Sequence, residues 1–559
     1  MVAFKDRFSR LSAIAEGVSF ATGTLNKTGV LSALSPSGVW SFARAARGTK
    51  PGPHSATMLH AANKPEKIAL IEGKRRIRYG DMDRQINQLA HGLAALGVHG
   101  GDCVALMMPN CLEYVIAQQA LARIGATAVQ IGYRLKGPEV AYILDNAEPR
   151  AVIVHASHAA AMNQARATAG GPPESHVVVV RAAPGATMHG IRYEELLVQH
   201  AGDRPPASTG GAGVIVYTSG TTGRPKGAAR DMRKTGLEAV ADFMAKVGMR
   251  HDDIHLVVCP LYHSAAPAFA AMMFTLGATL VIEEHFDAEA VLATIARERI
   301  TSAFMVPTML VRLASVPNAV RAKYDTGSLR WIVSGAAPLP TETARRFQDR
   351  YGHLLWNFYG STETGLVTLA GPEDHVERPG TVGQLLRGNE VRLLDEQGCE
   401  VAPGEVGELY ARNSMLISGY HKNQEATDKS IRDGFFSVGD LAHRDADGYV
   451  YLASRKHDMV ISGGVNIYPR EIEDHLHTHP EILEAAVIGV PHEEWGESLK
   501  AFVVRRAGST LGAQAVIDYC RDALADYKRP RAVEFLTELP HNPTGKVLKR
   551  ELRDREAPP

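Results

Sequence analysis

The sequence predicts an α/β protein with more than one domain. From about residue 75, amphipathic helix-like runs alternate with short apolar strand-like runs, which is the pattern of βαβ units and parallel sheets. Several apolar runs end in polar or glycine-rich segments, and ligands of open α/β sheets bind beyond the carboxyl ends of the strands. The chain has 559 residues, which is too long for one ordinary hydrophobic core.

The first half of the chain contains the clearest elements. Hydrophobic periodicity predicts helices over 83–97, Leu112–Ile124 and about 138–146. Strands are expected between them, over Cys103–Met108, Thr127–Ile131 and Ala151–His155. Three further short apolar runs precede polar loops and are expected to be strands: Val214–Tyr217, Trp331–Ser334 and Leu354–Phe358.

The character of the sequence changes after about residue 390. Short strand-like pieces alternate there with turn dipeptides such as Asp433-Gly434 and Asp447-Gly448. A boundary is expected near residues 455–458, followed by about a hundred residues with their own α+β pattern. The Pro- and Gly-rich stretch Gly202–Gly213 is expected to be a flexible segment.

Composition excludes several classes of protein. Lys+Arg and Asp+Glu both number 61, so the chain lacks the basic excess expected of a nucleic-acid-binding protein. The five cysteines are scattered without Cys-x-x-Cys spacing, which favours a reduced, cytoplasmic compartment. No run approaches the ~18 apolar residues of a membrane span, and polar residues interrupt any signal-peptide core.

Residues 1–20 have two interpretations. Phe4, Phe8, Leu11 and Ala15 recur at helical spacing, with Lys5, Arg7 and Arg10 elsewhere on the helix. A helix packed on the protein body is favoured because the apolar face is short. An interfacial helix that makes peripheral membrane contact is the alternative. The first 55 residues therefore form an extension of unknown role.

The segment Tyr217–Ala228 combines four aliphatic hydroxyls, three glycines and Lys226 directly after an apolar run. Hydroxyls, close-approaching backbone N–H groups and a lysine are suited to a polyphosphate, although the order is not that of a Walker A loop. The segment resembles the phosphate loop of adenylate-forming enzymes, the superfamily of acyl-CoA synthetases, firefly-type luciferases and peptide-synthetase adenylation domains. The resemblance implies ATP as a substrate, with phosphates held by Thr218, Ser219, Gly220, Thr221, Thr222, Gly223 and Lys226.

Further motifs follow in the order found in that superfamily, from about Tyr79 to Leu552. Asn357, Phe358, Tyr359, Gly360, Ser361, Thr362 and Glu363 resemble its adenine and metal motif. Tyr359 is then expected to stack on adenine, Thr362 to bond the α-phosphate, and Glu363, together with Thr218, to hold Mg²⁺. Gly335 and Ala336 lie in a segment similar to the loop along adenine and the acyl group.

The remaining motifs imply the ribose contacts and the two half-reactions. Asp440 matches an aspartate that grips the ribose hydroxyls, and Arg455 matches a second ribose contact. Lys546 resembles the C-terminal lysine that completes the adenylation site, so Lys546, Glu363 and Thr218 are the candidate catalytic residues. Gly464 resembles the glycine that leaves room for the pantetheine arm of CoA in the second half-reaction.

The resemblance implies a particular domain organisation. Residues 1–456 would form an N-terminal core of mixed and parallel sheets flanked by helices, with a β-barrel-like subdomain. Residues 457–559 would form a small mobile α+β lid that turns about a hinge at His457. The family usually has Asp or Lys at this hinge, so His457 is a departure that could make the rotation pH-sensitive.

Two pairs of histidines have spacing that suggests a metal site. His475 and His479 share a helical face, and His251 and His255 are also four residues apart. Neither pair has an evident third ligand, so metal binding at either is disfavoured.

His263 and the small apolar residues after it suggest the class of acid. Amino-acid-activating relatives usually carry an aspartate near the position of His263. Small residues over Ala265–Ala271 offer no partner for a charge and would leave volume for a chain, although a tightly packed alanine-rich helix is the alternative. A fatty acid of medium to long chain length is the expected acid. The residues expected to contact the substrates during activation and transfer to CoA are His263, Gly335, Gly360 and Gly464. An enzyme that delivers to a carrier protein, or an inactive acyl- or nucleotide-binding relative, are the rivals.

Overall fold

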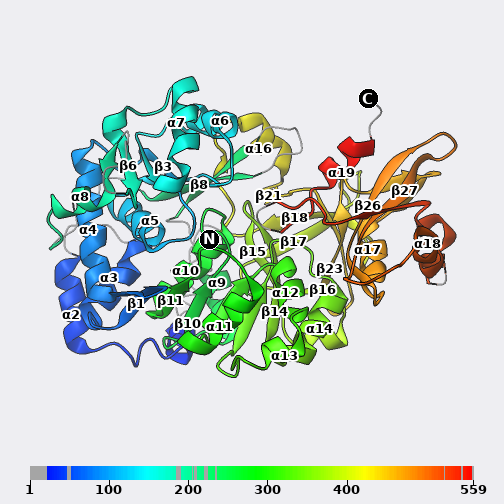
Figure 1. Cartoon of the computed structure of the whole chain (residues 1–559), viewed down its shortest axis with the longest axis horizontal. Coiled ribbons are helices and arrows are strands. Elements are labelled where there is room, and N and C mark those ends of the chain that lie inside the picture. The colour runs from blue at the N-terminus through cyan, green and yellow to red at the C-terminus, as the bar shows by residue number, and fades with distance from the viewer. Residues whose placement is uncertain are drawn as a thin grey trace, which may run out of the picture.

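A computed structural model confirms the α/β class (Figure 1). It describes residues 20, 22–46, 52–183, 190–203, 206, 211–218, 225–232, 236–521, 523–542 and 545–556. The helix predicted over residues 1–20 lies outside these residues, apart from Phe20. Ser219, Gly220, Thr221, Thr222 and Gly223 of the phosphate loop also lie outside them.

The first sheet has 15 strands and joins a parallel half to an antiparallel half. Its parallel strands carry continuous apolar runs, as expected for a sheet that is covered on both faces. The sheet runs in the order β2 (Arg75–Arg78), β1 (Ile68–Glu72), β11 (Thr279–Ile282), β10 (Ile254–Val257), β12 (Ser302–Met305), β13 (Trp331–Ser334) and β14 (Leu355–Ser361). It continues antiparallel through β15 (Gly365–Ala370), β16 (Thr381–Leu385), β23 (Val450–Arg455), β22 (Asp440–Arg444), β18 (Gly407–Arg412), β21 (Phe435–Phe436) and β20 (Ile431–Arg432), with β17 (Glu390–Leu394) on β18.

The antiparallel half encloses a small core of its own, which includes Val367, Val382, Leu409 and Val450. The second sheet has eight strands and is parallel through its centre. Its order is β19 (Gly419–Tyr420), β9 (Lys226–Asp231), β8 (Gly213–Thr218), β4 (Thr127–Gln130), β3 (Cys103–Met107), β5 (Ala151–His155), β6 (Val177–Val180) and β7 (Ile191–Arg192). The first two sheets share one large core.

The third sheet belongs to the C-terminal segment, drawn in orange and red on the right of Figure 1. Its strands are β25 (Val465–Ile467), β24 (Val460–Ser462), β27 (Gly496–Arg505), β26 (Ile482–His492) and β28 (Ala532–Leu536). Apolar clusters lie on its two faces, one around Ile472 and Val503 and one around Ile488 and Phe502. This separate core agrees with the predicted lid, and the division at residues 456 and 457 stays a prediction.

The helices follow the strands they connect. They are α2 (Pro36–Ala45), α3 (His54–Asn63), α4 (Tyr79–Ala95), α5 (Leu112–Ile124), α6 (Gly137–Ala147), α7 (Ala159–Thr168), α8 (Tyr193–Val198), α9 (Leu237–Val247), α10 (Ala265–Leu276), α11 (Ala288–Glu298), α12 (Pro307–Ala314), α13 (Asn318–Arg321), α14 (Thr341–Tyr351), α15 (Asp374–Glu377), α16 (Gln424–Ser430), α17 (Pro469–His477), α18 (Ala513–Arg521) and α19 (Lys549–Glu556). No helix within the described ranges is long and apolar enough to cross a membrane.

The predicted elements are confirmed, with corrections at their ends. Helix α4 begins at Tyr79 rather than at residue 83, because Tyr79 and Met82 are fully buried and extend the packed face by a turn. Strand β14 continues past Phe358 to Ser361, because it forms a hairpin with β15 in which Ser361 pairs with Gly365. The tip of this hairpin carries Thr362 and Glu363.

Candidate active site

The phosphate loop closes a β-hairpin between β8 and β9. Thr218 and Lys226 are cross-strand neighbours in this antiparallel pair, so both ends of the loop are fixed to the second sheet. The Thr218 hydroxyl lies 3.4 Å from the Lys226 carbonyl oxygen and 3.5 Å from Glu363 Oε1. The fold therefore brings Thr218, where the loop begins, to the tip of the β14–β15 hairpin.

Glu363 is a buried carboxylate, with 7% of its surface exposed. Its Oε1 lies within reach of the Thr218 hydroxyl and accepts a hydrogen bond from the Tyr420 hydroxyl at 3.2 Å. Within the described residues, no lysine or arginine forms an ion pair with it, although Arg230 contributes a nearby positive charge. A buried carboxylate without a direct cation, beside a threonine hydroxyl, fits Mg²⁺, which prefers hard oxygen ligands.

The backbone of the hairpin tip is held from two sides. Arg230 of β9 donates to the carbonyl oxygen of Thr362 at 2.7 Å, and the Thr362 hydroxyl lies 3.1 Å from that of Ser264. The Ser361 hydroxyl accepts from the backbone N–H groups of Glu363 and Thr364. These contacts fix Thr362 and Glu363 relative to both the second sheet and the segment that carries His263.

Tyr359, Asp440 and Arg455 form a connected group beneath this tip. The Tyr359 hydroxyl donates to Asp440 Oδ2 at 2.8 Å, and Arg455 Nε lies 3.1 Å from Asp440 Oδ1. Asp440 and Arg455 are cross-strand neighbours on β22 and β23, which explains their fixed geometry. Burial and the Asp440 charge raise the pKa of Tyr359, so its hydroxyl stays a donor. Asp440 and Tyr359 therefore place a fixed carboxylate and an aromatic ring in the wall of one cavity.

Two glycines are required by close packing. A Cβ on Gly360 would lie 1.9 Å from the Gly365 carbonyl oxygen, and one on Gly335 would lie 2.4 Å from the Phe358 ring. Gly360 therefore lets β14 and β15 approach each other at the end of their hairpin, and Gly335 leaves room for the Phe358 ring. The neighbouring Ala336 has φ +68°, a left-handed conformation that costs roughly 1–2 kcal/mol for a residue with a Cβ. Such strain is commonly stored beside functional cavities.

His263 lies beside Tyr262, with ring centroids 4.3 Å apart. Burial lowers its pKa to about 4, so the imidazole is neutral near pH 7. Its Nε2 is buried without a hydrogen-bond partner among the described residues, which is costly unless a ligand supplies one. His263 is not among the residues that line the cavity described below, so its contact with a carboxylic-acid substrate stays a prediction.

The alanine-rich segment after His263 is packed more tightly than the sequence suggested. In α10, Ala266, Phe269 and Ala270 are buried, and Phe269 lies against Phe304 with ring centroids 4.7 Å apart. None of these side chains lines the cavity described below. Their small size therefore serves packing of the large core, and the volume expected for an acyl chain is not found along α10 in that cavity.

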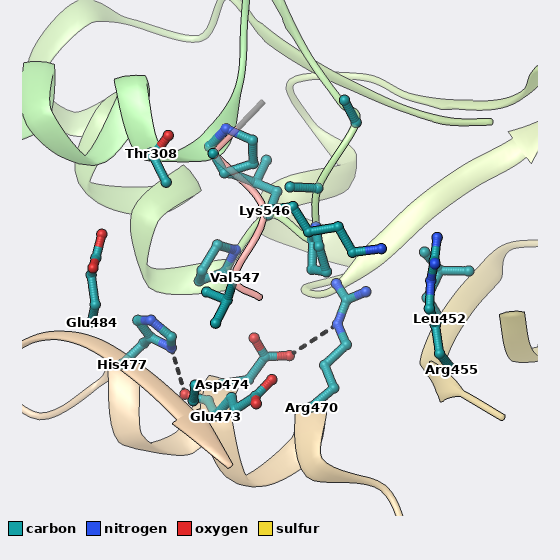
Figure 2. A pocket seen from close by; sticks show the side chains of 18 of the residues that line it. Thr308, Leu452, Arg455, Arg470, Glu473, Asp474, His477, Glu484, Lys546 and Val547 are labelled. Atoms are coloured by element: carbon teal, nitrogen blue, oxygen red, sulfur yellow. Dashed lines mark hydrogen bonds and ion pairs between the residues drawn. The ribbon is translucent and has the colours of Figure 1, made fainter. Parts of the chain in front are cut away.

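Lys546 reaches this cavity from the C-terminal segment. The cavity has a volume of about 230 Å³ and is lined by Tyr359, Asp440, Arg455 and Lys546 among others. Figure 2 shows Lys546 between Arg455 on one side and Arg470, Glu473 and His477 of α17 on the other. Burial and the neighbouring Arg455 charge lower the pKa of Lys546 to about 8. The site thus holds a partly desolvated ammonium that an anionic ligand would stabilise.

The structure separates the residues predicted for the two half-reactions. Asn357, Phe358, Tyr359, Gly360, Ala336, Asp440, Arg455 and Lys546 line one cavity. Gly464 instead lies at the turn between β24 and β25. Its φ is +80°, and no atom of the described residues lies within 4 Å of the position that a Cβ would take there. Gly464 therefore lies outside the cavity in the arrangement that holds Lys546 inside it.

His457 lies at the start of the C-terminal segment and is half-exposed. Its Nε2 is 3.7 Å from Asp458 Oδ1, and Arg553 of α19 ion-pairs with Asp458 at 2.7 Å. Burial lowers the pKa of His457 despite the Asp458 charge, with Arg455, Lys546 and Arg553 adding to the lowering. Protonation is therefore disfavoured in this arrangement, so acidification would weaken it. The hinge role itself stays a prediction.

His255 and His475, from the two histidine pairs with metal-like spacing, have structural roles. His255 is buried against Phe269 and Trp331, its Nδ1 lies 3.0 Å from the Ser302 hydroxyl, and burial lowers its pKa to about 4. His475 stacks on Tyr519. No group of three potential ligands occurs in the described part of the chain.

Sequence reasoning missed several residues of the site. Tyr420, Arg230 and Thr308 contact predicted residues but belong to no motif that was recognised. Tyr420 reaches Glu363 across 57 positions, and Arg230 reaches Thr362 across 132. No spacing in a single sequence marks such contacts. The pairing of β9 with β19 positions Tyr420, and the hydrogen bond of Arg230 joins β9 to the tip of the β14–β15 hairpin.

Comparisons with known proteins agree with this geometry. A family model described as AMP-binding enzyme matches residues 59–421, and one described as AMP-binding enzyme C-terminal domain matches 471–546. A feruloyl-CoA synthase from Amycolatopsis sp is 36% identical over 496 residues, which is 88% of this chain and 96% of that protein. The long-chain-fatty-acid–CoA ligase FadD13 from Mycobacterium tuberculosis is 34% identical, covering 86% of this chain and 93% of its own.

A solved structure extends the likeness to the whole fold. The anthranilate CoA ligase AuaEII, solved in complex with anthranoyl-AMP, superposes with a TM-score of 0.84 at 28% identity. The match covers 90% of this chain and 97% of that one.

Proposed function

The chain belongs to the AMP-binding, adenylate-forming enzymes as an acyl-CoA ligase, and from that premise we propose that it activates an apolar carboxylic acid, with a medium- to long-chain fatty acid as the expected substrate. The observation that carries the proposal is the convergence of Tyr359, Asp440, Arg455 and Lys546 on one cavity. Tyr359, Asp440 and Arg455 come from strands of the first sheet and Lys546 comes from the C-terminal segment, and together they match the contacts an adenylate requires.

The first half-reaction would form an acyl-adenylate. A carboxylate oxygen attacks the α-phosphorus of ATP, the bond between the α- and β-phosphates breaks, and pyrophosphate leaves. Thr218, Lys226 and the loop between them would hold the phosphates, while Asp440 and Arg455 would hold the ribose. Mg²⁺ held by Glu363 and Thr218 would neutralise phosphate charge. Lys546 would stabilise the negative charge that grows on the α-phosphate.

The second half-reaction would transfer the acyl group to CoA. The C-terminal segment turns about His457, which withdraws Lys546 and brings Gly464 to the site. The CoA thiol then attacks the acyl carbonyl, AMP leaves, and the thiol proton passes to solvent. One cleft would thus serve two chemistries in turn, separated by a conformational gate.

An aromatic acid is the second candidate, because α10 is tightly packed. Ala266, Phe269 and Ala270 fill the core behind His263 instead of lining the cavity. A short, flat acid needs less depth than a long acyl chain. The similarity to a feruloyl-CoA synthase supports the same alternative.

The two acids are separated by pyrophosphate release measured across fatty acids of increasing length and a set of cinnamate-type acids. For a fatty-acid ligase we expect kcat/KM to rise about fourfold per added methylene until the chain outgrows its pocket, because each buried methylene contributes about 0.8 kcal/mol. Aromatic acids that exceed every fatty acid would favour the second candidate. Absence of release with every carboxylate would contradict the ligase assignment itself. Release without acyl-CoA formation would indicate a carrier-protein acceptor.

Gly545 provides a test of the proposed rotation between the arrangement with Lys546 in the cavity and the arrangement with Gly464 at the site. It has φ +75°, and a Cβ there would lie 2.3 Å from the Thr308 hydroxyl of α12. We expect Gly545→Ala to slow adenylate formation at least about tenfold, since a steric cost of about 1.4 kcal/mol opposes docking of the Lys546 loop. Capture of supplied acyl-adenylate by CoA should change little.

Gly508→Ala is the matched control for this variant. Gly508 has φ +82° in the same C-terminal segment, and nothing lies within 4 Å of its Cβ position. The Gly508→Ala variant has the same kind of backbone strain as Gly545→Ala but makes no contact with α12. Equal losses in both half-reactions for Gly545→Ala would indicate general misfolding and contradict the gate.

A further inference from the structure

Tyr420 lies between the two charged groups of the phosphate end of the site. It belongs to the two-residue strand β19, which pairs antiparallel with β9, so Tyr420 is a cross-strand neighbour of Ala228. Its backbone N–H donates to the Thr427 hydroxyl at 2.9 Å, and its ring lies near Phe436. The side chain is therefore held from the backbone and from one face.

The hydroxyl and the ring of Tyr420 contact different partners. The hydroxyl donates to Glu363 Oε1 at 3.2 Å, and the Lys226 ammonium lies 5.1 Å from the centre of the ring. A cation over an aromatic face at this distance is attracted by the ring quadrupole. Burial and the Glu363 charge raise the pKa of Tyr420, so the hydroxyl remains a donor across the working pH range.

A direct contact between Lys226 and Glu363 would harm both of their expected roles. An ammonium paired with Glu363 would compete with Mg²⁺ for the carboxylate, and it would no longer be available to the phosphates. Both groups are near Thr218, which is the cross-strand neighbour of Lys226 and lies 3.5 Å from Glu363. No ion pair between Lys226 and Glu363 forms in the described structure, where each contacts Tyr420 instead.

We propose that Tyr420 is a positioning residue that keeps the metal carboxylate and the phosphate lysine apart and oriented. Its hydroxyl donates to Oε1 of Glu363 and would hold the carboxylate in position for Mg²⁺, while its ring holds the Lys226 ammonium where the phosphate loop ends. This inference rests on the proposed function, because it requires that Glu363 binds Mg²⁺. It makes no demand on which acid or acceptor the enzyme uses.

The test measures ATP binding by calorimetry over a series of Mg²⁺ concentrations, without any carboxylic acid present. We expect Tyr420→Phe to raise the Mg²⁺ concentration for half-maximal binding about tenfold, because a hydrogen bond to a charged group is lost. Binding of ATP without Mg²⁺ should stay near the parent value, since the ring still holds Lys226. Tyr420→Leu should weaken ATP binding both with and without Mg²⁺.

Tyr324→Phe is the matched control, because Tyr324 also donates to a glutamate, Glu289 Oε1 at 2.9 Å, but at an exposed position and to a carboxylate with no predicted metal role. It should leave the Mg²⁺ dependence unchanged. A Tyr420→Phe protein with the parent Mg²⁺ dependence would overturn the positioning role. If the phenylalanine variant is unstable, a Tyr420→Leu protein with the parent Mg²⁺ dependence would overturn it as well.

Glu363→Gln separates failure of this inference from failure of the proposed function. If Glu363→Gln shifts the Mg²⁺ dependence and Tyr420→Phe does not, Glu363 binds the metal and Tyr420 only packs. If neither variant shifts it, the metal assignment of the proposed function is wrong, and the positioning role fails with it.

Discussion

Replacing Lys546 with glutamine is expected to lower the rate of acyl-adenylate formation about 10²–10³-fold, the usual effect of removing one preorganised charge from a transition state. Lys546 lines the cavity, and Asp440 and Arg455 are among the charged groups that act on its ammonium. Capture of supplied acyl-adenylate by CoA should stay within about threefold of the parent rate. Single-turnover pyrophosphate release and acyl-CoA formation measure the two steps.

The same lysine gives the expected pH dependence. Burial and Arg455 lower its pKa from the ordinary value to about 8, so the protonated form is present below that pH and lost above it. The kcat/KM of adenylation should therefore be flat below about pH 8 and fall above it, since kcat/KM reports the free enzyme. Lys546→Arg should move the decline upward, because arginine stays protonated.

Lys528→Gln is the control for loss of charge in the C-terminal segment. Lys528 pairs with Glu471 at 2.7 Å and does not line the cavity. Its replacement should leave both half-reactions near the parent rates. Parent-like adenylation by Lys546→Gln would contradict the role given to Lys546.

Replacing Glu113 with alanine is expected to lower the free energy of unfolding by about 1.5–3 kcal/mol, because its buried carboxylate accepts charge-assisted hydrogen bonds from two partly exposed arginines. Glu113 of α5 accepts from Arg75 at 2.7 Å and from Arg181 at 2.8 Å, and its side chain is 5% exposed. Arg75 belongs to β2 of the first sheet and Arg181 follows β6 of the second. The network therefore ties together the two sheets that frame the site. Denaturant unfolding measures the loss.

The pH dependence of this effect has a defined sign. Burial would raise the pKa of Glu113, but the hydrogen bond from Arg75 and the Arg181 charge outweigh it, and the net pKa is lowered. The stabilisation is present above the ordinary glutamate pKa and is lost as the pH falls through the lowered value. The difference in unfolding free energy between parent and Glu113→Gln should shrink over that acidic range.

Glu390→Ala is the matched control, because Glu390 pairs with Arg412 at the surface and is 60% exposed. Its loss should cost less than about 1 kcal/mol. Similar losses for the two glutamates would contradict the special role of the buried network.

Much of the fold could be predicted because its signals are local. Continuous apolar runs at Cys103–Met107 and Trp331–Ser334 are buried strands in the structure, and α5 has the predicted bounds. The ends of elements were less certain, since packing decides them: Tyr79 begins α4 because it is buried in the core. The β14 strand is longer than predicted because β15 pairs with it.

In the candidate site, too, some features follow from local residue order and others from packing. Glu363, Asp440, Arg455 and Lys546 could be found because each lies in a segment with a characteristic order of residues. The sequence leaves two interpretations of the alanine-rich segment after His263, space for an acyl chain or a tightly packed helix, and in the structure Phe269 of this segment stacks on Phe304. A sequence pattern gives side-chain size, but it does not say which face of a helix meets the core.

The sequence by itself determined the α/β class and the enzyme family, and it predicted the phosphate loop and the residues expected to hold an adenylate, because those depend on residue order within short segments. Only the tertiary structure decided that Lys546 lies inside the cavity while Gly464 lies outside it, and that Tyr420 stands between Lys226 and Glu363. These contacts join segments far apart in the chain. They arise from strand pairing and domain docking, whose free energy comes from burial summed over many residues rather than from any one motif.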